Sequence, residues 1–379
     1  MTLTLSSEAR LVQDTALEFF RDKSPITALR KLRDTQDTDG FSRPLWREMA
    51  ELGWTGFLVP EEWGGSGFGH VGLGLVMEAA GRTLAATPLL STSLIGASAL
   101  ALAGSGMQKD THLPGLVAGD QIFALALEEG PRHAPTHIAT AAKKHGGGYR
   151  LSGKKTFVLD GHVADTLIVA ARTSGGVNDR AGITLFLVPA SAPGVSRTRT
   201  IMVDSRNTAM VELADVEVAD EAALGPIDGG SDVLEAVLDR ARAGLAAEML
   251  GSAAECFERT VQYLKDRKQF GVAIGSFQGL KHRAAQMFCE LEVTHSAVLA
   301  CLSGLDEGAN DAAALASLAK AKANDTFFLV GNEGVQMHGG IGMTDEHEIG
   351  FFTKRARVAL ATFGTSAFHR DRYAALNGY

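Results

Sequence analysis

Residues 266–278 read D-R-K-Q-F-G-V-A-I-G-S-F-Q, and residues 336–344 read Q-M-H-G-G-I-G-M-T. Each stretch ends a long segment whose apolar residues recur at helical spacing. Gly339 and Gly340 leave backbone N–H groups open to an anion, and the guanidinium of Arg267 suits bidentate binding of a phosphate. A charged helix end and a glycine-rich turn explain the same residues, so their meaning depends on the rest of the chain.

The spacing of apolar residues divides the chain into three parts. Residues 1–120 show helical spacing, interrupted by turn residues. Residues 121–225 contain short segments of alternating apolar and polar residues, which indicates an antiparallel sheet rather than βαβ units. Residues 226–379 return to helical spacing. We therefore predict an α+β fold with an N-terminal helical domain, a middle β domain and a C-terminal helical domain, bounded as these ranges are.

Three long helices are predicted in the last part, one running to about Lys265 and the others over residues 278–303 and 311–335. The charge-free stretch from Thr83 to Gln108 is long enough to span a bilayer, but it contains Pro88 and several serines. We interpret it as a buried helix of a globular domain and expect no membrane association.

Composition narrows the classes of partner. The 379 residues carry a formal net charge of -8 without a polybasic run, so binding to nucleic acid is not expected. The three cysteines form no C-x-x-C pair, which argues against a zinc site and fits a reducing compartment. Glu8, Asp14 and Glu18 lie where a signal peptide would be apolar. We therefore expect a cytoplasmic protein that has no metal.

The string formed by Gly67, Gly69 and Gly72 matches G-x-G-x-x-G, the dinucleotide-binding pattern. No strand–turn–helix unit surrounds it, and no acidic residue ends a second strand about 20 residues on. We interpret these glycines as a flexible loop.

Three stretches together carry a resemblance: G-W-T-G-F-L-V-P-E-E-W-G-G-S-G at 53–67, and the two at 266–278 and 336–344. In order and spacing they resemble acyl-CoA dehydrogenases over nearly the whole chain. That resemblance implies a helical N-terminal domain, a central β domain and a C-terminal four-helix domain. It also implies tetramers that bind FAD partly across a subunit interface, an acyl-CoA substrate, and an electron-transfer flavoprotein as acceptor.

The resemblance also assigns residues. Those expected to bind the FAD pyrophosphate and adenosine, or to lie beside the cofactor, are Arg267, Phe270, Gln278, Gln336, Met337, His338, Gly339, Gly340, Thr365 and Ser366. Phe157 and Leu159 fall where the family covers the flavin ring, although Leu159 offers no hydroxyl to flavin N5. Asp239, Arg242 and Gly364 are expected near the acyl-CoA. A salt bridge inside the helical bundle explains Arg242 equally well.

The family's catalytic carboxylate is missing. The family reaction removes an α-proton from the acyl-CoA with a carboxylate base and passes a hydride from the β-carbon to flavin N5. Phe363 occupies the usual base position before Gly364 and Thr365, and Ala241 occupies the position that a minority of members use. Neither side chain accepts a proton, so no catalytic residue is identified. The backbone N–H of Phe363 remains available to polarise the thioester carbonyl.

The middle domain departs from the family as well. The loop that lies near the pyrophosphate in the family reads E-E-G-P-R-H-A-P-T at 128–136. These departures resemble the smaller or β subunits of hetero-oligomeric dehydrogenases that act on pimeloyl-CoA or steroid side-chain CoA esters. In such assemblies one subunit brings the base and the other completes the FAD sites.

Other carboxylates are poor substitutes for the base. Glu248 lies about 10 Å along the helix from Ala241, and Asp239 points to another face. Asp345 and Glu346 follow the glycine-rich turn and are expected in solvent. Three hypotheses remain open: a subunit that needs a base-bearing partner, a homo-oligomeric enzyme with a relocated base or different acyl-CoA chemistry, and a non-catalytic FAD- or acyl-CoA-binding scaffold.

Overall fold

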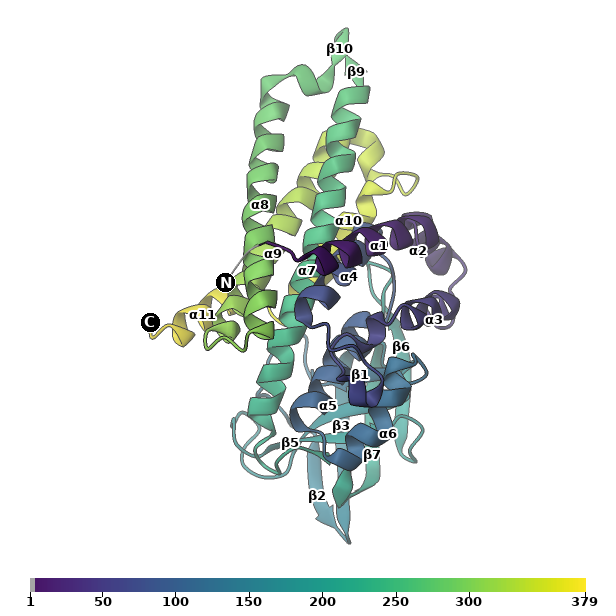
Figure 1. Ribbon diagram of the computed structural model, residues 1–379, viewed down its shortest axis with the longest axis vertical. Coiled ribbons are helices and arrows are strands. Elements are labelled where there is room, and N and C mark those ends of the chain that lie inside the picture. The colour runs from purple at the N-terminus through teal and green to yellow at the C-terminus, as the bar shows by residue number, and fades with distance from the viewer. Residues whose placement is uncertain (1–3) are drawn as a thin grey trace. The chain divides into compact units, whose positions relative to one another are not determined.

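The computed structural model describes residues 4–379, which fall into two compact units (Figure 1). We call them the helical unit (up to Lys31, His70–Ala85 and Arg242–Tyr379) and the sheet unit (Leu32–Gly69 and Ala86–Ala241). Helix α7 (Gly230–Asp266) begins in the sheet unit and continues into the helical unit. The N-terminal helices are divided between both units, so the predicted division into three consecutive domains remains a prediction.

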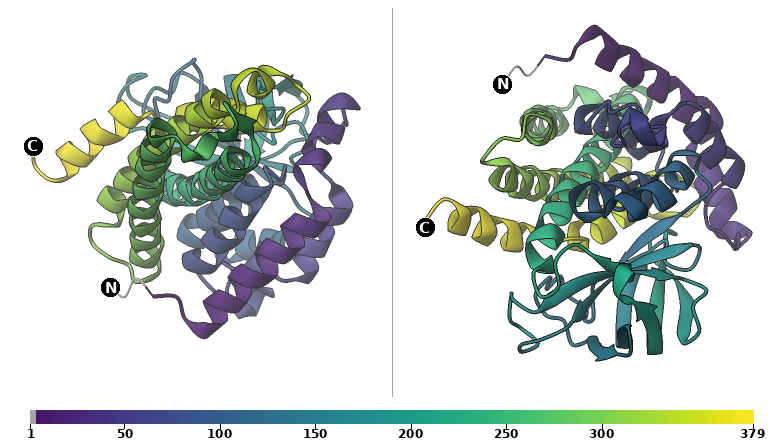
Figure 2. Two further views of the ribbon diagram at one scale, coloured as in Figure 1. Left: turned by 90° about the horizontal axis from the view of Figure 1, so that it is seen from above. Right: turned by 60° about the horizontal axis from the view of Figure 1, so that its bottom comes forward.

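The helical unit is a bundle of long helices, seen from above in the left view of Figure 2. It contains part of α7 together with α1 (Ser7–Lys23), most of α2 (Ile26–Asp34), α4 (His70–Arg82), α8 (Gln278–Asp306), α9 (Ala312–His338), α10 (Ile349–Ala361) and α11 (Ser366–Leu376). Helix α9 packs against α8, α10 and α11, and α4 packs against α1 and α8.

Two glycines let α4 and α7 approach backbone to backbone. A side chain at Gly81 would collide with the carbonyl of Glu248, and one at Gly251 would collide with the carbonyl of Glu78. The hydroxyl of Ser252 donates to the carbonyl of Gly81 over 2.8 Å at the same contact. This close crossing fixes the part of α7 that carries Arg242 and Glu248.

The sheet unit combines short helices with a twisted sheet, shown in the right view of Figure 2. The helices are α3 (Arg43–Glu51), α5 (Ala97–Ala103) and α6 (Gly106–Val117). The strands are β1 (Phe123–Ala126), β2 (Ala141–His145), β3 (Gly148–Leu159), β4 (Thr166–Arg172), β5 (Ile183–Pro189), β6 (Val195–Ile201), β7 (Asn207–Ala219) and β8 (Ala223–Leu224). Their order is β6-β7-β3-β2-β4-β5-β8, with β1 beside β4.

Most pairs in the sheet are antiparallel, as predicted; β1 runs parallel to β4, and β2 meets β4 in parallel at one residue. Strand β3 pairs with β7 along its length, but the register shifts between Lys155 and Val158. Such a bulge bends the strand and turns a side chain in a new direction. Phe157 lies at this bulge.

The predicted α+β organisation is confirmed, and the long helices end within a few residues of their predicted bounds. The stretch from Thr83 to Gln108 is not one helix, contrary to our interpretation. Leu84 adopts a φ of 54° and Pro88 follows, which ends α4 and starts a π-helix at Leu89–Gly96. The π-helix is buried, as expected of that segment.

Among the described helices, only α8 is long and apolar enough to cross a membrane by length and composition. Core helices of globular proteins meet the same criterion, and α8 packs against α4 and α9.

Candidate functional site

The helical unit contains a turn between α10 and α11 with two consecutive residues of positive φ. Phe363 has a φ of 56° and Gly364 a φ of 116°. The first value is uncommon for a bulky side chain, and such strain persists where surrounding contacts hold it. Phe363 is only 8% exposed, so an aromatic ring fills the place predicted for the base.

Both carbonyls of this turn accept hydrogen bonds from buried side chains. The Phe363 carbonyl accepts from Arg242 Nε over 3.4 Å and contacts His369 Nε2 at 3.1 Å. The Gly364 carbonyl accepts from Lys320 Nζ at 3.4 Å and from Asn324 Nδ2 at 3.3 Å. The turn is therefore anchored from α7, α9 and α11.

Arg242 and Gly364 thus lie at the same turn, and their position near the acyl-CoA stays a prediction. The Arg242 side chain is fully buried, and its guanidinium also lies 5.6 Å from the centre of the Phe368 ring. Ala241 and Asp239 are buried in the sheet unit's part of α7. Ala241 is 0% exposed and carries no ionisable group, so the second base position also lacks a side chain that accepts a proton.

The alternative carboxylates in the helical unit have other partners. Glu248 is buried and accepts from Arg355 Nε over 2.9 Å. Asp345 is exposed and pairs with Arg30 at 3.1 Å, and Glu346 is exposed, as expected for both. None of these contacts prepares a carboxylate to take a proton from a substrate.

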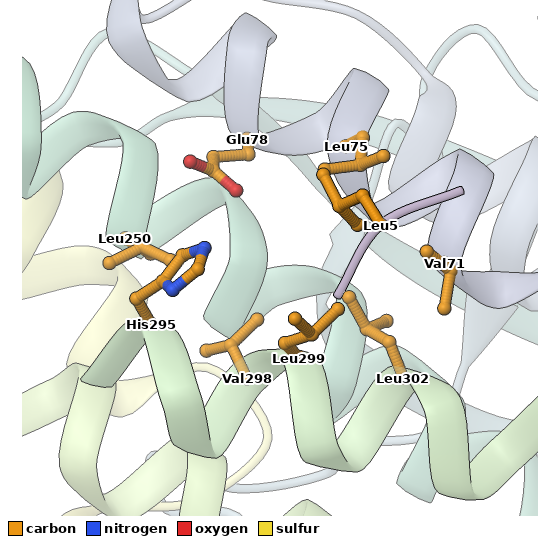
Figure 3. A pocket seen from close by; sticks show the side chains of 9 residues that line it. All are labelled: Leu5, Val71, Leu75, Glu78, Leu250, His295, Val298, Leu299 and Leu302. Atoms are coloured by element: carbon orange, nitrogen blue, oxygen red, sulfur yellow. The ribbon is translucent and has the colours of Figure 1, made fainter. Parts of the chain in front are cut away.

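Glu78 is a half-buried carboxyl group that sequence reasoning missed. It faces a small pocket opposite His295 on α8, as Figure 3 shows. The remaining lining residues are apolar: Leu5, Val71, Leu75, Leu250, Val298, Leu299 and Leu302. Burial raises the pKa of Glu78 to about 7, and nearby Arg82 opposes the shift. The 363–364 turn does not line this pocket, so its geometry gives Glu78 no role at the turn.

The stretch at 266–278 forms the connection between α7 and α8. A two-stranded hairpin of β9 (Lys268–Gln269) and β10 (Val272–Ala273) projects Phe270 at its tip, where this ring is 92% exposed. Arg267 is exposed beside it, and Gln278 is the exposed first residue of α8. These three residues share one end of the bundle and present groups suited to a phosphate and a flat ring.

The glycine-rich stretch ends α9 near the same end of α7. Residues Gly339–Met343 form a 3-10 turn, and a side chain at Gly339 or Gly340 would meet no other atom within 4 Å, so the backbone is accessible. His338 is buried, stacks on Tyr263 at 4.3 Å and contacts the Gly334 carbonyl through Nδ1. These contacts fix the backbone at the start of the glycine-rich turn, and the imidazole itself is not open to solvent.

The remaining residues of the predicted cofactor set in the helical unit differ in exposure. Gln336 is exposed, whereas Met337 is buried in the bundle. Thr365 caps α11, its Oγ1 accepting from the Phe368 amide at 3.4 Å, and Ser366 donates to Asp325 over 2.7 Å. Met337 therefore offers a cofactor only its backbone.

The sheet unit presents Phe157 for a flat ligand. This residue is 44% exposed and has a φ of 51° at the bulge in β3, a strained conformation that aims an aromatic ring outward. Leu159 is half-buried two residues on. The exposed ring fits the expected cover for an isoalloxazine.

The 128–136 loop beside β3 is held by its own charges. Lys155 is fully buried and donates to Glu129 Oε1 over 2.7 Å, and the Glu129 carboxylate also accepts from the Ala139 and Thr140 amides. Burial lowers the pKa of Lys155 to about 8 despite this pairing. Glu128 contacts His133 Nδ1 at 2.5 Å. The loop is thus held by ion pairs and hydrogen bonds within the sheet unit.

Sequence reasoning missed Lys320, Asn324 and His369, which hold the turn. Lys320 lies in the run A-L-A-S-L-A-K-A-K-A-N-D, where a lysine on an apolar helix face is the only signal. His369 is buried within the last helix, and no motif marks it. Their role becomes visible only when α9, α10 and α11 are packed.

Comparison with known proteins identifies each part of the chain. Residues 6–120, 125–216 and 228–376 match the N-terminal, middle and C-terminal domains of acyl-CoA dehydrogenase. Acyl-CoA dehydrogenase FadE12 of Mycobacterium tuberculosis is 33% identical over 83% of this chain and 82% of its own length.

Solved structures give the same result at the level of fold. A chain of the Tcur3481-Tcur3483 steroid ACAD is 32% identical, with a TM-score of 0.89 and coverage of 99% of this chain and 98% of that one. A chain of the ChsE4-ChsE5 complex from Mycobacterium tuberculosis is 26% identical, with a TM-score of 0.90 and complete coverage of both.

Family members and the structural neighbours are FAD-dependent, and the exposed Phe157 and the accessible Gly339–Gly340 backbone fit that cofactor. FAD is therefore the cofactor that this fold takes. The three matched domains and the relative at 33% identity place the whole chain in one family: it belongs to the acyl-CoA dehydrogenases.

Proposed function

We propose that this chain is the base-deficient subunit of an FAD-dependent acyl-CoA dehydrogenase and that a second family member supplies the carboxylate. The single observation that carries the proposal is the buried Phe363 ring at the base position. Ala241 at the second position and the Arg355 partner of Glu248 support it, because they remove the nearest substitutes.

The proposed reaction converts an acyl-CoA into the 2-enoyl-CoA. The partner's carboxylate takes the α-proton, the β-hydrogen leaves as hydride, and the electron pair of the α-carbon–hydrogen bond forms the double bond. Bound FAD supplies the hydride acceptor. The assembly then passes electrons to an electron-transfer flavoprotein, in keeping with the caffeyl-CoA reductase-Etf complex subunit CarC of Acetobacterium woodii, which is 29% identical over 95% of this chain.

This chain's own residues bind and orient. Arg267, Phe270, Gln278 and the Gly339–Gly340 backbone hold the pyrophosphate and adenosine, while Phe157 covers the flavin ring. Arg242, with Gly364, keeps the acyl-CoA thioester in place, and the backbone N–H of Phe363 polarises its carbonyl. The base-deficient subunit therefore contributes positioning and electrostatic stabilisation rather than proton transfer.

The names of the structural neighbours support a two-component assembly. The Tcur3481-Tcur3483 steroid ACAD and the ChsE4-ChsE5 complex each pair two named components. We propose a cytoplasmic hetero-tetramer whose substrate is a CoA ester from fatty acid or steroid catabolism.

Anaerobic flavin reduction tests the proposal. The chain is purified alone and together with a co-expressed family member, and acyl-CoA esters of graded size are added to each. We expect bleaching of the flavin band within seconds only in the presence of the partner. Rapid bleaching of the chain alone would overturn the proposal in favour of a relocated base, and a colourless protein in both preparations would favour a scaffold.

A further inference from the structure

Lys320 is a fully buried lysine that the proposed reaction does not use. It lies on α9, and its Nζ donates to three oxygens: Asn324 Oδ1 at 2.6 Å, the Ala359 carbonyl at 2.9 Å and the Gly364 carbonyl at 3.4 Å. Three acceptors match the three protons of an ammonium group. Burial lowers the pKa of Lys320 well below its ordinary value, and the positive charges of Arg242 and Arg355 add to the effect.

The two carbonyls belong to the two sides of the strained turn. Ala359 lies in the last turn of α10, where helix carbonyls lack partners within the helix. Gly364 lies just before α11 and also accepts from Asn324 Nδ2. The buried side chain of Lys320 therefore binds the end of α10 and the residues just before α11, on both sides of Phe363.

Because the trans peptide group is planar, a hydrogen bond that fixes a carbonyl also fixes the direction of the next residue's N–H. The carbonyl of one residue and the N–H of the next point in opposite directions. Fixing the Phe363 carbonyl with Arg242 and His369 aims the Gly364 N–H away from the buried side chains. Fixing the Gly364 carbonyl with Lys320 and Asn324 does the same for the Thr365 N–H.

We propose that Lys320 is a positioning residue that acts through the Gly364 and Ala359 carbonyls, holding the 363–365 turn in the conformation that binds the acyl-CoA thioester. This role rests on the proposed function, since it requires the turn to contact the thioester. Lys320 does not touch the substrate. By binding Ala359 before the turn and Gly364 within it, Lys320 keeps the Phe363 N–H in place, so no reorganisation of the turn is needed when the thioester carbonyl gains negative charge.

Isotope-edited infrared spectroscopy tests the role directly. The probes are butyryl-CoA, octanoyl-CoA and palmitoyl-CoA, each labelled with ¹³C at the thioester carbonyl, bound to the flavin-loaded full chain with its partner. In the wild type we expect the carbonyl stretch to move to lower wavenumber. In Lys320→Met most of that displacement should disappear, and the affinity should fall about five- to tenfold, as the loss of one or two oriented hydrogen bonds predicts.

Lys322→Met is the matched control. Lys322 lies on the same helix two residues later and pairs with Glu290 of α8, away from the turn. It should keep the wild-type carbonyl displacement. If Lys320→Met does not fold, Asn324→Ala decides, because it removes one donor to Gly364 and should show an intermediate loss.

If folded Lys320→Met shows the wild-type displacement of the carbonyl stretch, the positioning role is overturned and the proposed function stands. Where Lys320→Met does not fold, the wild-type displacement in Asn324→Ala has the same meaning. Absence of any displacement in the wild type would overturn the proposed function and, with it, the positioning role.

Discussion

Arg355 donates to Glu248 over 2.9 Å inside the helical bundle, and both side chains are buried. This pair holds the carboxylate that would otherwise be the best substitute for the missing base. The guanidinium occupies the carboxylate oxygen and holds it away from any substrate. The pair therefore makes Glu248 a structural carboxylate of α7.

Glu248→Gln should destabilise the chain by about 3 kcal/mol, because it leaves a buried arginine without its charged partner. The measurement is urea unfolding. Glu258→Gln, an exposed position on the same helix that pairs with Arg82, should cost less than about 1 kcal/mol. Flavin reduction per folded molecule should not change in Glu248→Gln with the partner present. A large fall in that rate would identify Glu248 as a relocated base.

Phe363→Glu should give the chain a base of its own. The carboxylate would replace a buried ring beside Arg242, whose positive charge favours its ionised form. Flavin bleaching by the chain alone should then rise about 10²- to 10⁴-fold, the usual contribution of a general base.

Phe363→Gln is the control for that variant, since it has the same size as the glutamate and accepts no proton. Equal rates in Phe363→Glu and Phe363→Gln would show that the turn does not place position 363 over the α-carbon. Stopped-flow absorbance at the flavin band measures both variants.

Gly364→Ala should disrupt the turn. The φ of 116° is open to glycine, and a Cβ there would lie 2.5 Å from Phe368 Cδ1 and 2.8 Å from His369 Nε2. We expect a loss of stability of about 2 kcal/mol or more and a weaker affinity for acyl-CoA. Gly106→Ala, at the start of α6 with nothing within 4 Å and no positive φ, should be neutral or slightly stabilising in thermal unfolding. A folded, fully binding Gly364→Ala would contradict the importance of the turn conformation.

The fold was largely predictable from the sequence because its signals are local. Helical spacing from Leu234 onward and alternation after Gln121 report burial within single elements. The break in the 83–108 stretch was missed because the stretch carries no charged residue to mark it, while the interruption depends on the backbone at Leu84 and Pro88.

The site was predictable only where a motif lies in one stretch of sequence. The sequence identified Phe363 and Arg242 as positions of interest. It did not identify Lys320 and His369, because each acts on a carbonyl contributed by another element. Glu78 escaped notice for the same reason: its apolar surroundings come from α4, α7 and α8 together.

Glu78 should make stability depend on pH. Burial raises its pKa from 4.5 to about 7, so the folded chain holds a proton that the unfolded chain releases. The stability contributed by the protonated form is complete below about pH 4.5 and is lost as the pH rises through about 7. His295 faces the same pocket and Arg82 lies nearby, and a positive charge on either favours the ionised form of Glu78.

Glu78→Gln mimics the neutral carboxyl at every pH. Urea midpoints at pH 5 and pH 8 should show the variant gaining about 1–2 kcal/mol on the wild type between these values, less than the full shift because part of the side chain meets solvent. Parallel stability curves for the two proteins would mean that Glu78 is ionised in the folded state across this range.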